Sequence, residues 1–187
     1  MKLFCITGLF VFFAFTNSWN GKSFDFRLDG IVPEETGSSI SREDAVDALR
    51  FHNNIRKDVG SPPLEWSEEL AKYAQEWANY LAEKNNCRIA HRSTLGKADR
   101  VTGENIFRGT GKEFSALDAS KAWYEEIENY TYQPIRANSG SKTGHYTQMV
   151  WKSSRKAGIG KAKCSNGSII IVANYDPPGN VIGKNPY

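Results

Sequence analysis

Apolar residues recur at helical spacing in the first half of the chain. At about 100° per residue, residues 42–58 and the position after them form one apolar sector. Its members are Ala45, Ala48, Leu49, Ile55 and Val59. Ser41 and Asp44 make an N-cap signal before this segment. Residues 68–84 repeat the pattern behind Ser67, with Leu70, Tyr73, Ala74, Trp77 and Leu81 on one stripe. Two amphipathic helices are therefore predicted.

A third helix is predicted from about residue 115 to 129. Its apolar stripe is centred on Leu117, Trp123, Ile127 and Tyr130. The helical wheel separates the two adjacent carboxylates of this segment. Glu126 lies at the edge of the stripe, where it can enter a partly desolvated cleft, and Glu125 projects into solvent.

The second half of the chain is predicted to contain β-strands. Residues 157–164 and 168–175 are rich in β-formers, and Asn166-Gly167 between them is a strong hairpin signal. Residues 103–107 are too short to assign. Segment 88–102 is predicted to be a loop, and residues 130–143, rich in Gly and Ser, a mobile loop.

In one further segment, successive side chains are predicted to alternate between two faces. In residues 144–151 one face carries His145, Thr147, Met149 and Trp151, and the other carries Tyr146, Gln148 and Val150. This period of two predicts a strand with a titratable ligand at its mouth. Two or three strands with about three helices bury all their faces only when helices cover both sides of a small sheet. The pattern thus predicts an α+β fold.

The N-terminus is typical of a secretory leader. Lys2 precedes an apolar core at residues 9–15, and small residues follow, so residues 1–18 are predicted to be removed. The alternative, an N-terminal anchor, needs roughly 20 apolar residues, and this run is shorter. Residues 19–40 have no helical or strand period and are interpreted as an extension, which leaves 41–187 as one domain. No later segment is long and apolar enough to cross a membrane.

Charge narrows the classes of partner. The chain has 24 Lys and Arg residues and 21 Asp and Glu residues. Without residues 1–18 the balance is 23 to 21, because only Lys2 is lost. No run of five like charges occurs, so nucleic acid is not indicated, and electrostatic attraction to a membrane is expected to be weak.

The cysteine count suggests one bridge. Cys5 leaves with the leader, and Cys87 and Cys164 remain. An even pair in an exported chain indicates a disulfide, and two reduced, buried thiols are the alternative. Asn129 and Asn166 each begin a glycosylation sequon.

One histidine of the first predicted helix is a candidate functional residue. His52 falls in the middle of the first apolar sector, either as a core residue with satisfied hydrogen bonds or as a ligand at the rim of a cavity. The chain has no HExxH helix, no GxSxG elbow and no cysteine poised as a nucleophile, which argues against a known hydrolase machinery.

Two strings resemble the signatures of the CAP superfamily, which contains cysteine-rich secretory proteins, insect venom antigens and plant pathogenesis-related proteins. They are residues 144–151 (GHYTQMVW) and 175–180 (YDPPGN). The resemblance covers about residues 41–187 and implies a three-layer α-β-α sandwich with a small antiparallel sheet. It also implies a bridge between Cys87 and Cys164. Of two further family bridges, one is lost at both Ile159 and Ala173, and Thr143 stands at a position of the other.

The same resemblance implies a site. The strings around His52, Glu104, Glu126 and His145 match family motifs, and these four residues are expected to form a cleft for Zn2+ or another divalent cation, with the glutamates as ligands or supporting groups. His91 is interpreted as a structural residue of its loop.

The resemblance further implies a secreted binding protein rather than an enzyme. Relatives bind sterols or other lipids or act in defence against microbes, so a sterol or fatty acid ligand is expected here. The loop with Tyr130, Tyr132, Pro134 and Ile135 corresponds to the region linked to sterol capture. An extracellular protein partner, as for a toxin-like effector, is the alternative, and a metal-dependent hydrolase is a further one.

Overall fold

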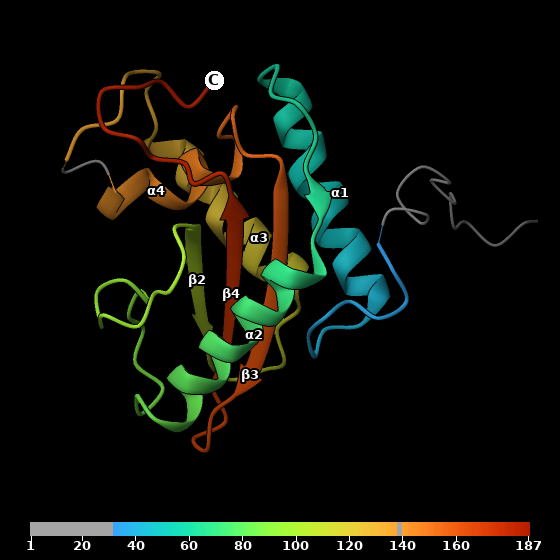
Figure 1. The fold of residues 1–187 in the computed structure, drawn as a ribbon. Helices are drawn as coiled ribbons and strands as arrows, with labels where there is room; N and C mark the ends of the chain where they lie inside the picture. The colour runs from blue at the N-terminus through green and yellow to red at the C-terminus, as the bar shows by residue number, and fades with distance from the viewer. Residues whose placement is uncertain (1–31, 138–139) are drawn as a thin grey trace, which may run out of the picture.

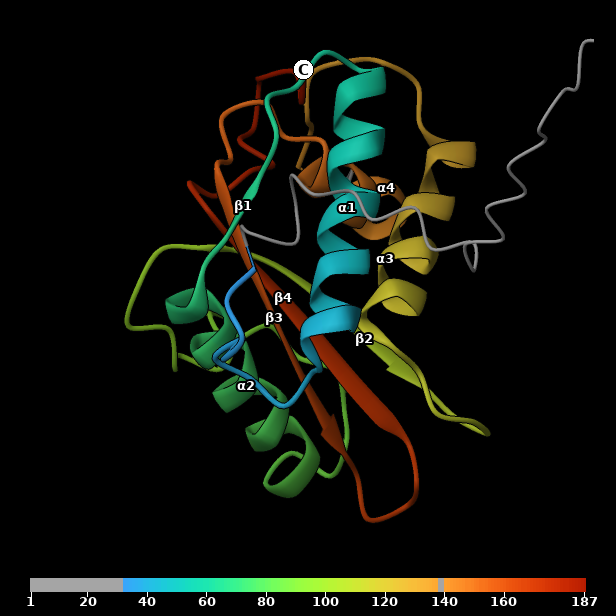
Figure 2. The ribbon, with the colours of Figure 1, turned by 90° about the vertical axis from the view of Figure 1, so that its right-hand side faces the viewer.

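A mixed sheet lies between two helical layers. The computed structural model describes residues 32–137 and 140–187, and Figure 2 shows α2 on one side of the sheet and α1, α3 and α4 on the other. The helices are α1 Arg42–Asp58, α2 Glu68–Glu83, α3 Ala116–Tyr124 and α4 Gly140–Met149, with a 3-10 helix, η1, at Glu125–Asn129. The predicted α+β sandwich is confirmed. The predicted leader, residues 1–18, lies outside the described residues.

The sheet has four strands in the order β1-β3-β4-β2 (Figure 1). They are β1 Glu65–Trp66, β2 Gly103–Gly109, β3 Lys156–Lys163 and β4 Ile169–Asp176. β4 pairs antiparallel with both β3 and β2, but the short β1 runs parallel to β3. The sheet is therefore mixed, where an antiparallel one was expected.

The first two helices begin at the predicted caps, and the third begins close to its predicted start. Ser41 Oγ accepts the Asp44 amide at 3.1 Å, and Ser67 Oγ accepts the Leu70 amide at 3.3 Å. Ser115 forms a capping box with Asp118 at the start of α3. The third helix is shorter than predicted, because its last turn, η1, is of the 3-10 type.

Residues 140–149 form a helix, which corrects the prediction of a strand at 144–151. Every residue from Tyr146 to Trp151 is buried, so this segment has no solvent-facing stripe from which a helical period can be read. The predicted loop 130–143 is correspondingly shorter and ends where α4 begins.

The predicted hairpin is confirmed. Cys164 and Ser168 close the turn with a backbone hydrogen bond of 2.8 Å, and Gly167 has φ +81°. Cys164 is bridged to Cys87, just beyond the end of α2. Ile159 and Ala173, the positions of the lost family bridge, face each other across β3 and β4.

Two glycines let α2 lie directly on the sheet. A Cβ on Gly158 would come within 2.2 Å of the Ala71 nitrogen, and one on Gly160 within 2.3 Å of the Gln75 nitrogen. These positions on β3 therefore fix the distance between the α2 layer and the sheet.

The N-terminal boundary of the folded part differs from the predicted one. Val32, Thr36 and Ile40, which were assigned to an extension, are buried, and Val32 and Ile40 belong to the same core as α1. Trp66 Nε1 also donates to Thr36 O at 2.9 Å. Residues 32–40 are thus part of the packed domain.

Candidate functional site

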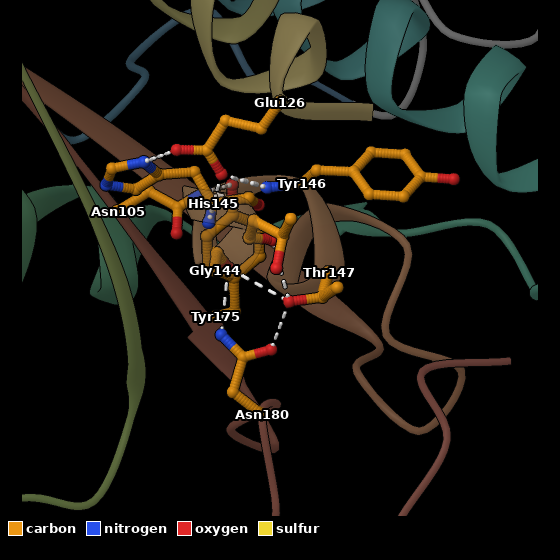
Figure 3. A network of polar contacts seen from close by, with 9 residues as sticks. Asn105, Glu126, Gly144, His145, Tyr146, Thr147, Tyr175 and Asn180 are labelled. Atoms are coloured by element: carbon orange, nitrogen blue, oxygen red, sulfur yellow. Dashed lines mark hydrogen bonds and ion pairs between the residues drawn. The ribbon is translucent and has the colours of Figure 1, made fainter. Parts of the chain in front are cut away.

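The start of the GHYTQMVW string is held by a carboxylate from the neighbouring helix. Glu126 of η1 accepts three hydrogen bonds from α4 (Figure 3): one from His145 Nδ1 at 2.7 Å and two from the amides of His145 and Tyr146, at 2.8 and 3.2 Å. Burial alone would raise the pKa of Glu126, but the bonds from His145 and the amides outweigh it and lower that pKa. Glu126 is therefore an ionised anchor for His145, as its place at the edge of the stripe predicted, and Glu125 is exposed.

A second set of bonds ties α4 to the C-terminal string. Thr147 Oγ1 donates to Asn180 Oδ1 at 2.6 Å, and Asn180 Nδ2 donates to Gly144 O at 2.8 Å. Asn180 has φ +55°, so its backbone turns sharply at this contact. The two strings that carry the family resemblance are thus in direct contact, as Figure 3 shows.

His52 is a buried core residue with both ring nitrogens in hydrogen bonds, the first of the two interpretations that its position in the apolar sector allows. Its Nδ1 lies 2.9 Å from Ala48 O and its Nε2 lies 2.9 Å from the Tyr175 hydroxyl. Burial lowers its pKa to about 4, so the ring is neutral near neutral pH. Both nitrogens already have partners, so neither is available to an ion.

His52 is joined to His145 only indirectly. Asn105 Nδ2 donates both to the Tyr175 hydroxyl, at 3.3 Å, and to the main-chain oxygen of His145, at 3.1 Å. This chain of polar groups fixes the position of the α4 backbone relative to α1 and β4. It makes His52 a positioning residue for His145.

Glu104 pairs with His91, a residue that the sequence analysis treated as structural. Glu104 Oε1 lies 2.7 Å from His91 Nδ1 and also accepts the Arg92 amide at 3.1 Å. The hydrogen bond to Glu104 raises the pKa of His91 against the opposing effect of burial. No periodicity marks His91. The only signal in the sequence was a histidine in a long loop beside the cysteine.

The four predicted ligands do not meet in one cluster. His52 bonds to the Tyr175 hydroxyl, and the other three belong to two separate pairs, His91 with Glu104 and His145 with Glu126. Across residues 32–137 and 140–187 no group of three or more His, Cys, Asp or Glu side chains is arranged to hold a metal ion.

A cavity of about 490 Å³ adjoins the His91–Glu104 pair. The Arg92 guanidinium stacks 3.6 Å from the centre of the Tyr73 ring and donates to Tyr73 O at 2.7 Å. Arg100 lies 5.0 Å from the same ring. Charged groups and the Tyr73 ring therefore both line this cavity.

The four residues predicted to bind lipid have different surroundings. Tyr130 packs against Tyr146, with ring centres 5.3 Å apart, and Tyr132 donates its hydroxyl to Tyr187 O at 2.6 Å. Pro134 is exposed. Ile135 is buried and paired by backbone hydrogen bonds with Lys184 and Gly183.

Ile135, one of these four, lines a second cavity. This second cavity, of about 190 Å³, is bounded by residues of the 135–137 loop, α4 and the C-terminal segment: Ile135, Arg136, Ala137, Gly144, Thr147, Asn180 and Ile182. Ile182 is 69% exposed and forms part of its rim. No motif in the sequence marks Ile182, because it lies beyond the C-terminal string.

Comparison with known proteins decides the family. The model of the cysteine-rich secretory protein family, CAP, matches residues 49–175. Pathogenesis-related protein 1C of Nicotiana tabacum is 38% identical over 157 residues, which cover 84% of this chain and 87% of that protein. This chain belongs to the CAP family.

A human relative and a solved structure extend the likeness. Golgi-associated plant pathogenesis-related protein 1 of Homo sapiens is 38% identical to this CAP chain over 79% of its length and 92% of the human protein. The crystal structure of NaASP2 with Zn2+ is 28% identical, has a TM-score of 0.65, and covers 79% of this chain and 86% of that one.

Two other predictions concern the surface of the CAP domain. Asn129 and Asn166 are both exposed, so both sequons are sterically open, and their use stays a prediction. Among the helices described here, none has the length and apolar character needed to span a membrane.

Proposed function

We propose that this CAP protein is a secreted, defence-related binding protein that captures an apolar ligand, a sterol or a fatty acid, without transforming it. The family description, secretory, and the pathogenesis-related relatives support the first part. The leader at residues 1–18 is the means of export in this proposal. Sequencing the N-terminus of the exported protein tests it, and a chain that begins at Trp19 is expected.

The cavity of about 190 Å³ is the observation that carries the ligand proposal. Its wall joins the buried Ile135 to the exposed Ile182. Sites that enclose a drug-sized ligand measure roughly 300–1,000 Å³, so this one accepts one end of a ligand, such as a sterol tail or an acyl chain. The remainder of the ligand then lies against Ile182, where it covers apolar surface that otherwise faces water.

Filling the cavity tests this proposal. The nearest atom to a Cβ built on Gly144 is Asn180 Nδ2, at 3.9 Å, so this position has room for a Cβ. Gly144 lines the cavity, which a longer side chain at this position is expected to enter. Gly144→Leu is expected to weaken binding of a fluorescent sterol and of a fluorescent fatty acid at least tenfold. Ser93→Leu, in the cavity beside the His91–Glu104 pair, is the matched control and should leave binding unchanged.

Equal binding by Gly144→Leu and the wild type would remove the cavity from the proposal. If the wild type binds neither probe but retains a protein from extracellular fluid or cleaves an ester, the effector or hydrolase alternative replaces it.

A divalent cation at the histidines is a second candidate, favoured by one geometric feature. In each His–Glu pair the carboxylate holds Nδ1 at 2.7 Å, which leaves Nε2 outside the pair. A carboxylate in this position fixes the tautomer that presents a lone pair at Nε2, as in metal sites. A relative whose structure was determined with Zn2+ supports the same proposal.

The donor set limits what such a site does. Structural zinc sites use four protein ligands and catalytic ones three, and no cluster of that size occurs in the described residues. His91 and His145 would each supply one nitrogen, and Glu104 and Glu126 would orient them. A bound cation would supply Lewis acidity. The site proposed here is therefore exchangeable and weak, and calorimetric titration with Zn2+ tests it.

A further inference from the structure

All the large apolar side chains that the described residues expose lie on three loops. These side chains are Ile89, Leu95, Val101, Tyr132, Val181 and Ile182. The loops are residues 88–102, 130–137 and 177–187, called here the loop face. In Figure 1 the loop face lies on the left-hand side of the molecule, away from α1. Val101 is 82% exposed and Ile182 is 69% exposed. Single exposed apolar residues are ordinary, but confining six of them to one side is not.

The loop face is also where positive charge gathers. It contains six of the 23 basic residues of segment 19–187 and one of its 21 acidic residues. The basic residues are Arg88, Arg92, Lys97, Arg100, Arg136 and Lys184, and the acidic one is Asp99. The remainder of segment 19–187 is net negative. The prediction of weak attraction to membranes assumed an even spread of charge, and folding breaks that assumption.

Part of this charge is neutralised by α2. Arg100 pairs with Glu69 at 2.8 Å, and Arg92 lies 3.8 Å from Glu76. Arg88 and Lys97 are exposed, and the structure gives neither an ion pair with a described residue. With Lys184, which is exposed as well, these cations are available to attract anions.

We propose that the loop face docks on an anionic lipid bilayer. Exposed apolar side chains among cations are the combination that inserts into the headgroup region while the cations approach lipid phosphates. A sulfated sugar or a nucleic acid would use the cations but would gain nothing from Val101 or Ile182. The apolar residues therefore favour a lipid surface over a soluble polyanion.

Docking of this kind places the ligand cavity at the membrane. Ile182 belongs both to the loop face and to the rim of the cavity. A sterol or acyl chain leaving the bilayer would then enter with little exposure to water. This step rests on the proposed ligand function, but docking itself is measured without any added ligand, so the two proposals fail separately.

Vesicle flotation tests docking, with protein that begins at Trp19 so that the apolar run of the leader is absent. Binding to phosphatidylcholine vesicles that contain phosphatidylserine should exceed binding to pure phosphatidylcholine and should fall as salt rises. Arg88→Gln with Lys97→Gln should reduce it about fivefold for each cation removed. Lys57→Gln with Lys121→Gln, on α1 and α3, makes the same change in charge elsewhere and should have no effect.

An apolar variant separates a bilayer from a polyanion. Val101→Ser with Ile182→Ser should weaken vesicle binding while leaving any retention on a heparin column unchanged. The proposal is overturned if the wild type binds neither kind of vesicle, or binds both equally. It is also overturned if the two charge variants behave alike, or if the apolar variant binds vesicles as the wild type does.

Discussion

Tyr175 donates its hydroxyl hydrogen to Nε2 of His52, 2.9 Å away. The direction of this hydrogen bond follows from the partner of the other ring nitrogen, Nδ1. Ala48 O can only accept, so Nδ1 of His52 carries the hydrogen and Nε2 of the neutral ring is an acceptor. Asn105 in turn donates to the Tyr175 hydroxyl. Protonation of His52 would make both nitrogens donors and leave the Tyr175 hydrogen without its acceptor.

The first prediction is a loss of stability in acid through His52. Its pKa is about 4 in the folded protein and about 6.5 in the unfolded chain. The unfolded chain therefore binds more protons between these values. The contribution is complete above pH 6.5 and is lost as pH falls to about 4, by about 3 kcal/mol. Urea denaturation at a series of pH values should show a shallower dependence for His52→Gln. The same acid loss in both proteins would contradict this assignment.

The second prediction concerns Arg56, a buried cation that caps α4. Its guanidinium donates to the carbonyls of Met149, Trp151 and Ser154 at 2.8–2.9 Å, and Nε donates to Pro62 O at 2.8 Å. Burial lowers its pKa to about 10, so it stays charged at neutral pH.

Arg56→Met removes the donor that these four carbonyls share. Ser154 O keeps Arg155 Nη1 as a donor, and Trp151 O keeps the Ser154 amide. The substitution should reduce the free energy of unfolding by about 3 kcal/mol or more. Arg56→Lys should recover only part of the loss, because an ammonium cannot match the planar fork. Lys57→Met, exposed on the same helix, should change stability by less than about 0.5 kcal/mol. A loss for Arg56→Met as small as that control would show that the cap is dispensable.

The third prediction is that the Cys87–Cys164 bridge is a major part of the stability. It joins residues 77 apart in sequence, and chain-entropy arguments give about 4 kcal/mol for a loop of this length. Cys87→Ser with Cys164→Ser should lower the free energy of unfolding by roughly that amount. Reduced wild-type protein should behave like the double variant, and a variant as stable as the oxidised protein would refute the estimate.

The fourth prediction separates the residues of the ligand site by burial. Ile182→Ser should weaken sterol or fatty acid binding by about tenfold and leave stability unchanged, because its side chain is exposed. Ile135→Ser should lower stability by 2 kcal/mol or more, by analogy with about 2–5 for large-to-small changes in a core. Leu95→Ser is the matched control, exposed and distant from the cavity lining. Loss of affinity in Leu95→Ser equal to that in Ile182→Ser would point to surface adsorption instead.

The caps and the hairpin could be predicted because their signals are local. Ser41 needs only the amide of Asp44, and Asn166-Gly167 needs only the strands on either side of it. The α4 helix could not be predicted, because residues remote in sequence satisfy part of its backbone. Glu126 accepts the amide of His145 within the helix, and Arg56 donates to the last carbonyl, that of Met149.

The pairing of His91 and His145 with glutamates could not be predicted in full for the same reason, because the partners are remote in sequence. A histidine on an apolar sector fits either a ligand or a core residue, and the contact between His52 of α1 and Tyr175 of β4 favours the core residue. His91 was passed over because a loop has no period, and Glu104 becomes its partner only when β2 is in place.

The last prediction follows from the replacement of His52 by His91 as a candidate metal ligand. If a divalent cation binds at the His–Glu pairs, His91→Ala and His145→Ala should each lower the affinity for Zn2+ at least tenfold, whereas His52→Gln should leave it unchanged. Affinity should also fall in acid, since a protonated imidazole is not a ligand. The pKa of His91 is raised by Glu104, so its contribution should be lost at a higher pH than that of a free histidine. Calorimetric titration of the three variants from pH 8 to pH 6 provides the measurement. A loss of affinity confined to His52→Gln would instead restore the buried histidine as the ligand and refute the assignment of the pairs.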